Sequence, residues 1–182
     1  MNGIPGFLAG TALLLWFSRK PLRAPGSHGF YRFFAWEAIL LLFVLNHGVP
    51  PAATNSAWQA ASAALMLVSI PLAGFGLLAL RRRGQAGQER DEPGFYAFER
   101  TTTLVSSGLF KYIRHPMYTS LLALAWGLCL EDPNWLGVSL ALVASGFLLL
   151  TAKADEKECL GYFGAEYAAY RQRTWMFVPF LL

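Results

Sequence analysis

Apolar residues along this chain form five runs separated by short polar or charged segments. The runs cover residues 4–17, 30–45, 58–80, 117–130 and 135–152. The third run is the longest and reaches the roughly 20 residues that an α-helix needs to cross a bilayer. The first run is a little short for a span and would need a thinner bilayer or neighbouring residues. The pattern predicts an all-α polytopic membrane protein with about five transmembrane helices.

A tight turn joins the last two runs. The sequence EDPN at residues 131–134 is short and contains Pro133, so the fourth and fifth helices are predicted to form an antiparallel helical hairpin. With 182 residues, the chain has the length of one domain. We expect a single membrane domain over residues 1–182, with three spans over residues 1–83 and a core with the hairpin over residues 84–182.

Composition and charge agree with a membrane protein. Hydrophobic residues make up 55% of the chain and charged residues only 14%. The formal net charge is +4, but the basic residues flank apolar runs, so membrane topology explains them and we expect no nucleic-acid partner. With the N-terminus outside and the C-terminus cytoplasmic, all 15 Lys and Arg fall on the cytoplasmic side if Arg32 snorkels back to that face. We expect a prokaryotic plasma membrane.

The stretch over residues 104–118 carries the strongest candidate chemistry. Arg114 and His115 precede Pro116, and proline suits the first turn of a helix, whose free N–H groups attract anions. The hairpin would bring this stretch opposite Asp155 and Glu156, which follow the fifth run. Such an arrangement is either a plain salt bridge that fixes the hairpin or a site for a zwitterionic ligand. A purely topological role for the cations is a third interpretation.

The last 75 or so residues resemble the core of the isoprenylcysteine carboxyl methyltransferases and the related phospholipid methyltransferases. That pattern runs as L-V-x-S-G, then R-H-P-x-Y, a helical hairpin, an acid pair, F-G-x-x-Y-x-x-Y and a late proline. The matching residues are Leu104, Val105, Ser107, Gly108, Arg114, His115, Pro116, Tyr118, Asp155, Glu156, Phe163, Gly164, Tyr167, Tyr170 and Pro179.

The resemblance implies an integral-membrane methyltransferase that uses S-adenosylmethionine in a cytoplasmic pocket. Its cofactor-binding residues would be Thr103, Leu104, Val105, Tyr112, His115, Pro116, Met117, Tyr118, Asp155 and Glu156. Arg114 and Glu156 would be the catalytic pair, Arg114 for a carboxylate and Glu156 as a proton acceptor. The aromatic rings of Tyr112, Tyr118, Tyr167 and Tyr170 are candidates to contact the sulfonium, although Tyr167 and Tyr170 equally fit an interfacial belt.

The chain departs from the family pattern in ways that bear on the substrate. Carboxyl methyltransferases commonly carry an arginine four residues before the acid pair, and this chain has Thr151. Ser120 replaces a glycine, and Phe110 replaces a tyrosine. The substrate is expected to be lipidic and to enter from the bilayer. An isoprenylcysteine carboxylate, a phospholipid amine and a small thiol all stay open as methyl acceptors, with Thr151 counting against the first.

Two other interpretations of the whole chain are a sterol-reductase-like oxidoreductase that uses NADPH and a non-catalytic membrane scaffold. We expect no metal site, because the three histidines are far apart in sequence and His28 and His47 look like loop residues. Glu37 lies within a predicted span, so it is either functional or paired with Arg32 or another cation.

Overall fold

Helices account for the secondary structure of this protein. The computed structural model describes residues 3–46, 57–85, 87, 95–96 and 99–179. The α-helices are α1 (Gly3–Ser18), α2 (His28–Asn46), α3 (Ala57–Arg83), α4 (Pro116–Glu131), α5 (Trp135–Phe163) and α6 (Ala165–Gln172). Short 3₁₀ turns lie at Pro21–Arg23 and Gly108–Lys111. No strand occurs among the described residues, so the all-α prediction is confirmed.

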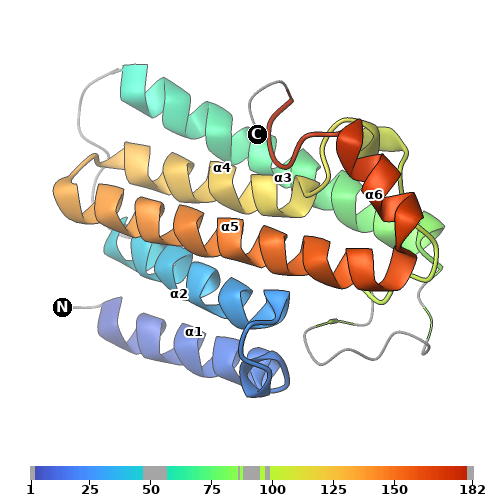
Figure 1. The fold of residues 1–182 in the computed structure, drawn as a ribbon. Helices are drawn as coiled ribbons and strands as arrows, with labels where there is room; N and C mark the ends of the chain where they lie inside the picture. The colour runs from blue at the N-terminus through green and yellow to red at the C-terminus, as the bar shows by residue number, and fades with distance from the viewer. Residues whose placement is uncertain (1–2, 47–56, 86, 88–94, 97–98, 180–182) are drawn as a thin grey trace.

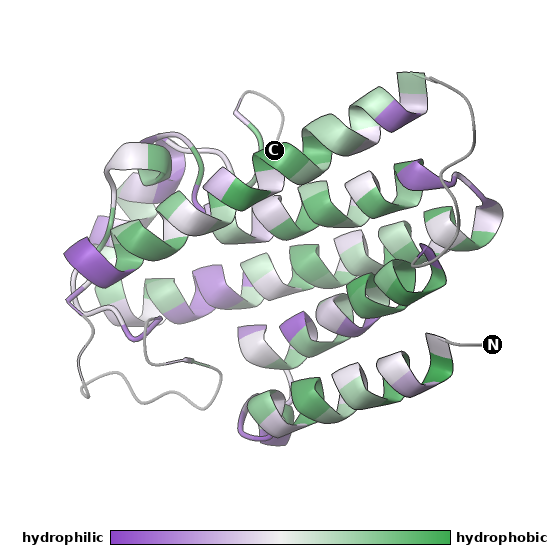
Figure 2. Cartoon of the chain, turned by 180° about the vertical axis from the view of Figure 1, so that it is seen from behind, coloured by the Kyte–Doolittle hydropathy of each residue, from purple (hydrophilic) through white to green (hydrophobic). Residues whose placement is uncertain are grey.

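The five long helices lie side by side in the order α1, α2, α5, α4, α3 (Figure 1). Apolar side chains cover much of the helices, and many hydrophilic residues gather at the end that holds α6 (Figure 2). Three helices, α2, α3 and α5, are long and apolar enough to cross a membrane. Helices α1 and α4 have 16 residues each and fall short of that length, so the count of five spans stays a prediction.

The predicted hairpin of α4 and α5 is present, and its turn is capped. Asn134 is the N-cap of α5, and its side chain accepts a hydrogen bond from the Gly137 N–H at 2.8 Å. The cap satisfies one of the N–H groups that a helix start leaves unpaired. The core beneath the hairpin includes Leu42, Leu128 and Leu148, which are almost fully buried.

Helix α5 is longer than its apolar run predicts. It continues past Ala152 through the charged sequence KADEKE and ends at Phe163, where Gly164 adopts a φ of 56°. Lys and Glu are good helix formers, and the helix ends where Gly164 adopts its positive φ. This extension carries Asp155, Glu156 and Glu158 at the hydrophilic end of the bundle on a rigid helix.

Two interpretations of charged residues within α2 are corrected. Arg32 does not snorkel to a surface, since it is 3% exposed and its guanidinium pairs with Glu99. Glu37 forms no ion pair with Arg32 in the part of the chain that the structure describes. Instead, its Oε2 accepts a hydrogen bond from Thr11 of α1 at 2.9 Å. The predicted loops over residues 46–57 and 84–103 lie largely outside the described residues, as does His47.

Helices α3 and α4 approach each other closely at Gly127. A Cβ added there would lie 2.7 Å from Met66 Cγ and 3.3 Å from the backbone of both Met66 and Ser62. Gly127→Ala is expected to lower the free energy of unfolding by about 1–3 kcal/mol, because backbone atoms cannot move aside easily. Reversible unfolding in detergent measures the change. Gly146→Ala is the control, since its Cβ would meet open space. Equal stability of the two variants would contradict the close approach.

Candidate active site

A pocket lies at the hydrophilic end of the bundle, between the start of α4, the extension of α5 and α6. Its apolar lining includes Leu104, Val105, Pro116 and Met117. The polar residues that line it are His28, Glu99, Thr101, Arg114, His115, Tyr118, Asp155, Cys159, Tyr167 and Tyr170. The pocket therefore gathers residues from both halves of the sequence pattern that flank the hairpin.

Local chain geometry holds the start of α4 in place. Pro116 begins the helix with His115 as its N-cap, as the sequence predicted. The preceding segment pairs with the C-terminal segment through a parallel bridge between Ile113 and Trp175. Two backbone hydrogen bonds, from Arg114 N–H to Trp175 O at 2.8 Å and from Trp175 N–H to Tyr112 O at 3.0 Å, fix this pairing.

The hairpin brings the cations and the acid pair together, as the sequence predicted. Arg114 Nε donates to Glu156 Oε1 at 2.6 Å, and Arg114 Nη1 also donates to the carbonyl oxygen of Thr174. His115 Nδ1 lies 3.5 Å from Asp155 Oδ2. Arg114 is thus bound to α5 and to the C-terminal segment at once. Arg114 therefore connects the start of α4, helix α5 and the C-terminal segment.

His115 is buried, with 6% of its surface exposed, and it stacks on Tyr118 with ring centroids 5.2 Å apart. Burial alone lowers the pKa of His115, but hydrogen bonding with Asp155 and Glu156, together with their charge, outweighs burial and raises the pKa. These contacts favour the positively charged form of the ring. Its Nε2 lies 3.5 Å from Glu156 Oε1, within ion-pair distance.

Asp155 is the acid that lines the pocket. Tyr118 donates its hydroxyl to Asp155 Oδ2 at 3.1 Å, and Cys159 Sγ lies 3.5 Å from Asp155 Oδ1. Tyr167 and Tyr170 also line the pocket and are 3% and 2% exposed. Tyr170 donates its hydroxyl to the Phe110 carbonyl oxygen at 2.7 Å.

Three of the residues expected from the sequence lie outside the lining of the pocket. Thr103 and Tyr112 are exposed, Tyr112 by 53%, and Glu156 faces Arg114 behind the pocket wall. The other expected cofactor-binding residues, Leu104, Val105, His115, Pro116, Met117, Tyr118 and Asp155, all line it.

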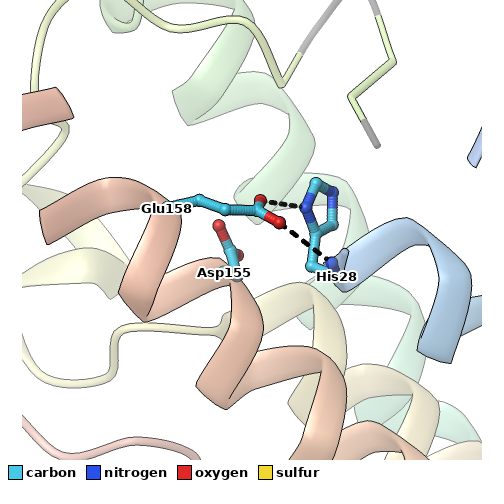
Figure 3. A group of neighbouring side chains, drawn as sticks. All are labelled: His28, Asp155 and Glu158. Carbon is cyan, nitrogen blue, oxygen red and sulfur yellow. Dashed lines mark hydrogen bonds and ion pairs between the residues drawn. The ribbon is translucent and has the colours of Figure 1, made fainter. Parts of the chain in front are cut away.

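His28 is a site residue that the sequence did not indicate. It begins α2 instead of lying in a loop, and it is 1% exposed. Its Nδ1 lies 2.5 Å from Glu158 Oε2, and its backbone N–H donates to Glu158 Oε1 at 3.1 Å (Figure 3). Its other ring nitrogen, Nε2, lies 3.5 Å from Glu99 Oε2. Only folding brings α2 and α5 together here, so sequence spacing gave no signal.

His28, Asp155 and Glu158 also offer ligand atoms within 4.8 Å of one another, close enough to hold a metal ion. A direct hydrogen bond holds the side chains of His28 and Glu158 together. Glu99 completes the network from the loop before α4. Burial alone raises the pKa of Glu99, but the charge of Arg32 and the hydrogen bond with His28 lower it, so the carboxylate stays ionised.

The fold and this pocket define a class: a polytopic helical membrane protein with a buried, charge-paired binding site at one end of its bundle. Residues 58–163 match the family model described as phospholipid methyltransferase. This match covers more than half of the chain and includes α3, α4 and α5. The chain belongs to the phospholipid methyltransferase family.

A curated relative agrees with this assignment. The chain is similar to a methanethiol S-methyltransferase from Pseudomonas sp. (strain GM41(2012)), with 30% identity over 74 residues. The alignment covers 41% of this chain and 28% of that relative. The chain thus matches under a third of the relative's length. No solved structure matches this chain.

Proposed function

We propose that this protein is an integral-membrane methyltransferase that uses S-adenosylmethionine and acts on a lipidic or membrane-partitioned substrate. The observation that carries the proposal is the pairing of opposite charges around one pocket within the family core. A zwitterionic ligand needs both a cation and an acid in its site. His115 and Asp155 supply them from the two helices of the hairpin.

The chemistry of the pocket fits this cofactor. The side chains of Arg114 and His115 line the pocket and suit the carboxylate of the amino-acid part, and the carboxylate of Asp155 suits an ammonium or ribose hydroxyls. Leu104, Val105 and Met117 would cover the adenine with apolar surface. Thr103 and Tyr112 would belong to the proposed site as neighbours of the residues that line the pocket. Glu156 belongs to it through its bond to Arg114.

When bound, S-adenosylmethionine supplies an electrophilic methyl group on a sulfonium. The residues of the chain would contribute mainly position, since orientation of two reactants is worth about 7–11 kcal/mol. The Arg114–Glu156 pair holds the start of α4 against α5, and this keeps His115 and Asp155 beside each other in the pocket wall, with His115 Nδ1 3.5 Å from Asp155 Oδ2. The aromatic rings of Tyr118, Tyr167 and Tyr170 provide faces that stabilise a cation by about 0.5–2 kcal/mol.

The methyl acceptor belongs to one of the three types left open above, an isoprenylcysteine carboxylate, a phospholipid amine or a thiol. Thr151 is fully buried, and its hydroxyl donates to the Phe147 carbonyl oxygen at 2.7 Å. It therefore cannot replace an arginine that would hold a carboxylate. The name of the Pseudomonas relative adds support for a thiol.

The pocket would face the cytoplasm, where a soluble cofactor is available. In this orientation the N-terminus lies outside and the C-terminus is cytoplasmic, as the basic residues around the spans favour. The membrane would be a prokaryotic plasma membrane.

Calorimetric titration of the detergent-purified protein with S-adenosylhomocysteine and, separately, with NADPH tests the proposal. We expect saturable one-to-one binding of S-adenosylhomocysteine and none of NADPH. Binding of NADPH alone would overturn the proposal in favour of a reductase. If protein with a native circular dichroism spectrum binds neither ligand, the result would favour a non-catalytic membrane scaffold.

A further inference from the structure

A second cavity of about 400 Å³ lies beside the cofactor pocket, between α1 and α2 on one side and α3 and α4 on the other. Its lining is mostly apolar and comprises Phe17, Arg32, Trp36, Ala73, Tyr96, Glu99, Met117, Tyr118, Ser120 and Leu121. We refer to this cavity as the chamber. Phe17 is 51% exposed on the outer surface of the bundle, so the chamber extends towards the lipid-facing side.

The chamber and the cofactor pocket share a wall. Glu99, Met117 and Tyr118 line both cavities. Methyl transfer requires the acceptor and the donor to approach along one line, so a chamber that adjoins the cofactor pocket is where an acceptor from the bilayer would wait. A volume of about 400 Å³ lies at the small end of ligand pockets, which span about 300–1,000 Å³.

The charged groups of the chamber are already matched by protein. The Arg32 guanidinium pairs with Glu99 and lies over the rings of Trp36 and Tyr96, 5.1 and 4.5 Å from their centroids. Ser120 donates its hydroxyl to the Met117 carbonyl oxygen at 2.6 Å. A carboxylate or ammonium entering this space would lose its hydration without an opposite charge to replace it. A neutral, weakly hydrated nucleophile would lose little hydration free energy on entering the chamber.

We propose that the chamber is the methyl-acceptor site and that it takes a neutral apolar thiol. This inference rests on the proposed function and names its substrate class. The new bond joins the methyl carbon to the thiol sulfur, and the sulfonium–methyl bond breaks with its electron pair left on the donor sulfur. Both sulfur atoms end as neutral thioethers.

The thiol proton must be accepted by a nearby group and passed to water, and residues of the shared wall can do this. Glu99 lines both cavities, and its carboxylate can accept the proton. His28 links Glu99 to Glu158 with contacts of 3.5 and 2.5 Å. The Glu158 side chain is 20% exposed, so the route reaches water. This assigns a function to a histidine that the cofactor pocket alone leaves unexplained.

Ala73→Phe tests the proposal because its ring would fill the chamber from α3. Ala64→Phe is the matched control, since Ala64 is exposed on the opposite side of the same helix at 3.6 residues per turn. We would titrate cofactor-free protein with straight-chain alkanethiols of increasing length, and with the corresponding alkylamines and fatty carboxylates. S-adenosylhomocysteine binding is measured in parallel.

We expect wild type to prefer the thiol, and Ala73→Phe to bind it about tenfold or more weakly while S-adenosylhomocysteine affinity stays unchanged. Ala64→Phe should match wild type in both. Leu121→Ala enlarges the chamber and should shift the preference to longer thiols. If Ala73→Phe does not fold, Leu121→Ala is the variant that tests the proposal. Unchanged thiol binding in the folded chamber variants, or stronger binding of the amine or carboxylate, would overturn the inference. Failure of wild type to bind S-adenosylhomocysteine would instead overturn the proposed function.

Discussion

Replacing Asp155 with alanine is expected to remove detectable S-adenosylhomocysteine binding while the protein stays folded. Asp155 lines the pocket, accepts the Tyr118 hydroxyl bond and lies beside His115, so it is the carboxylate available to a ligand ammonium. Loss of one partner of a desolvated charge pair weakens binding by about 2–5 kcal/mol, which is about thirtyfold or more in the dissociation constant. Isothermal titration of the detergent-purified variant measures it.

Asp132→Ala is the control for that experiment, because Asp132 is an exposed acid in the turn at the other end of the hairpin. It should bind S-adenosylhomocysteine as wild type does. His115→Ala should lose binding as Asp155→Ala does, because it removes the imidazole that lines the pocket beside Asp155. Normal affinity in both pocket variants would show that the ligand binds elsewhere.

Arg114→Ala is expected to lower the free energy of unfolding by about 3–5 kcal/mol, because it leaves Glu156 without its closest partner. The Arg114 and Glu156 side chains are only 10% and 7% exposed. Arg171→Ala is the matched control. Arg171 also faces Glu156, at 3.4 Å, but its side chain is 44% exposed, so its loss should change stability by at most about 1 kcal/mol. Denaturant unfolding in detergent compares the two variants.

The double variant Arg114→Ala/Glu156→Ala separates a structural role from a catalytic one. Removing both charges should restore part of the lost stability, because no unpaired carboxylate is left in the site. An Arg114→Ala protein as stable as Arg171→Ala, but without methyl transfer, would show that Arg114 acts on the substrate instead of holding the helices together.

Features encoded locally could be predicted from the sequence. Pro116 marks the start of α4, and the EDPN turn defines the hairpin, so the approach of His115 to Asp155 followed from covalent geometry alone. The family pattern then indicated most of the pocket lining. Cys159 was within reach of the same reasoning, since it lies one turn after Asp155 on α5.

The rest depended on packing between distant segments. His28 and Glu99 meet only when α2 lies against α5 and the loop before α4 folds back over both. The prediction that Arg32 snorkels was wrong for the same reason. Its local sequence shows a cation near a span end, but Glu99 and two aromatic rings shield it in the folded bundle.

The bridge between Ile113 and Trp175 has a consequence for how the protein is made. The segment after α6 supplies backbone acceptors to Arg114 and His115, and Phe177 packs beside the His115 ring. During synthesis this segment leaves the ribosome after all five long helices. A nascent chain that stops before it therefore lacks the backbone acceptors that hold the start of α4. A ligand of the pocket can then stabilise the bundle only after this segment has paired, and it cannot assist the earlier steps of membrane insertion.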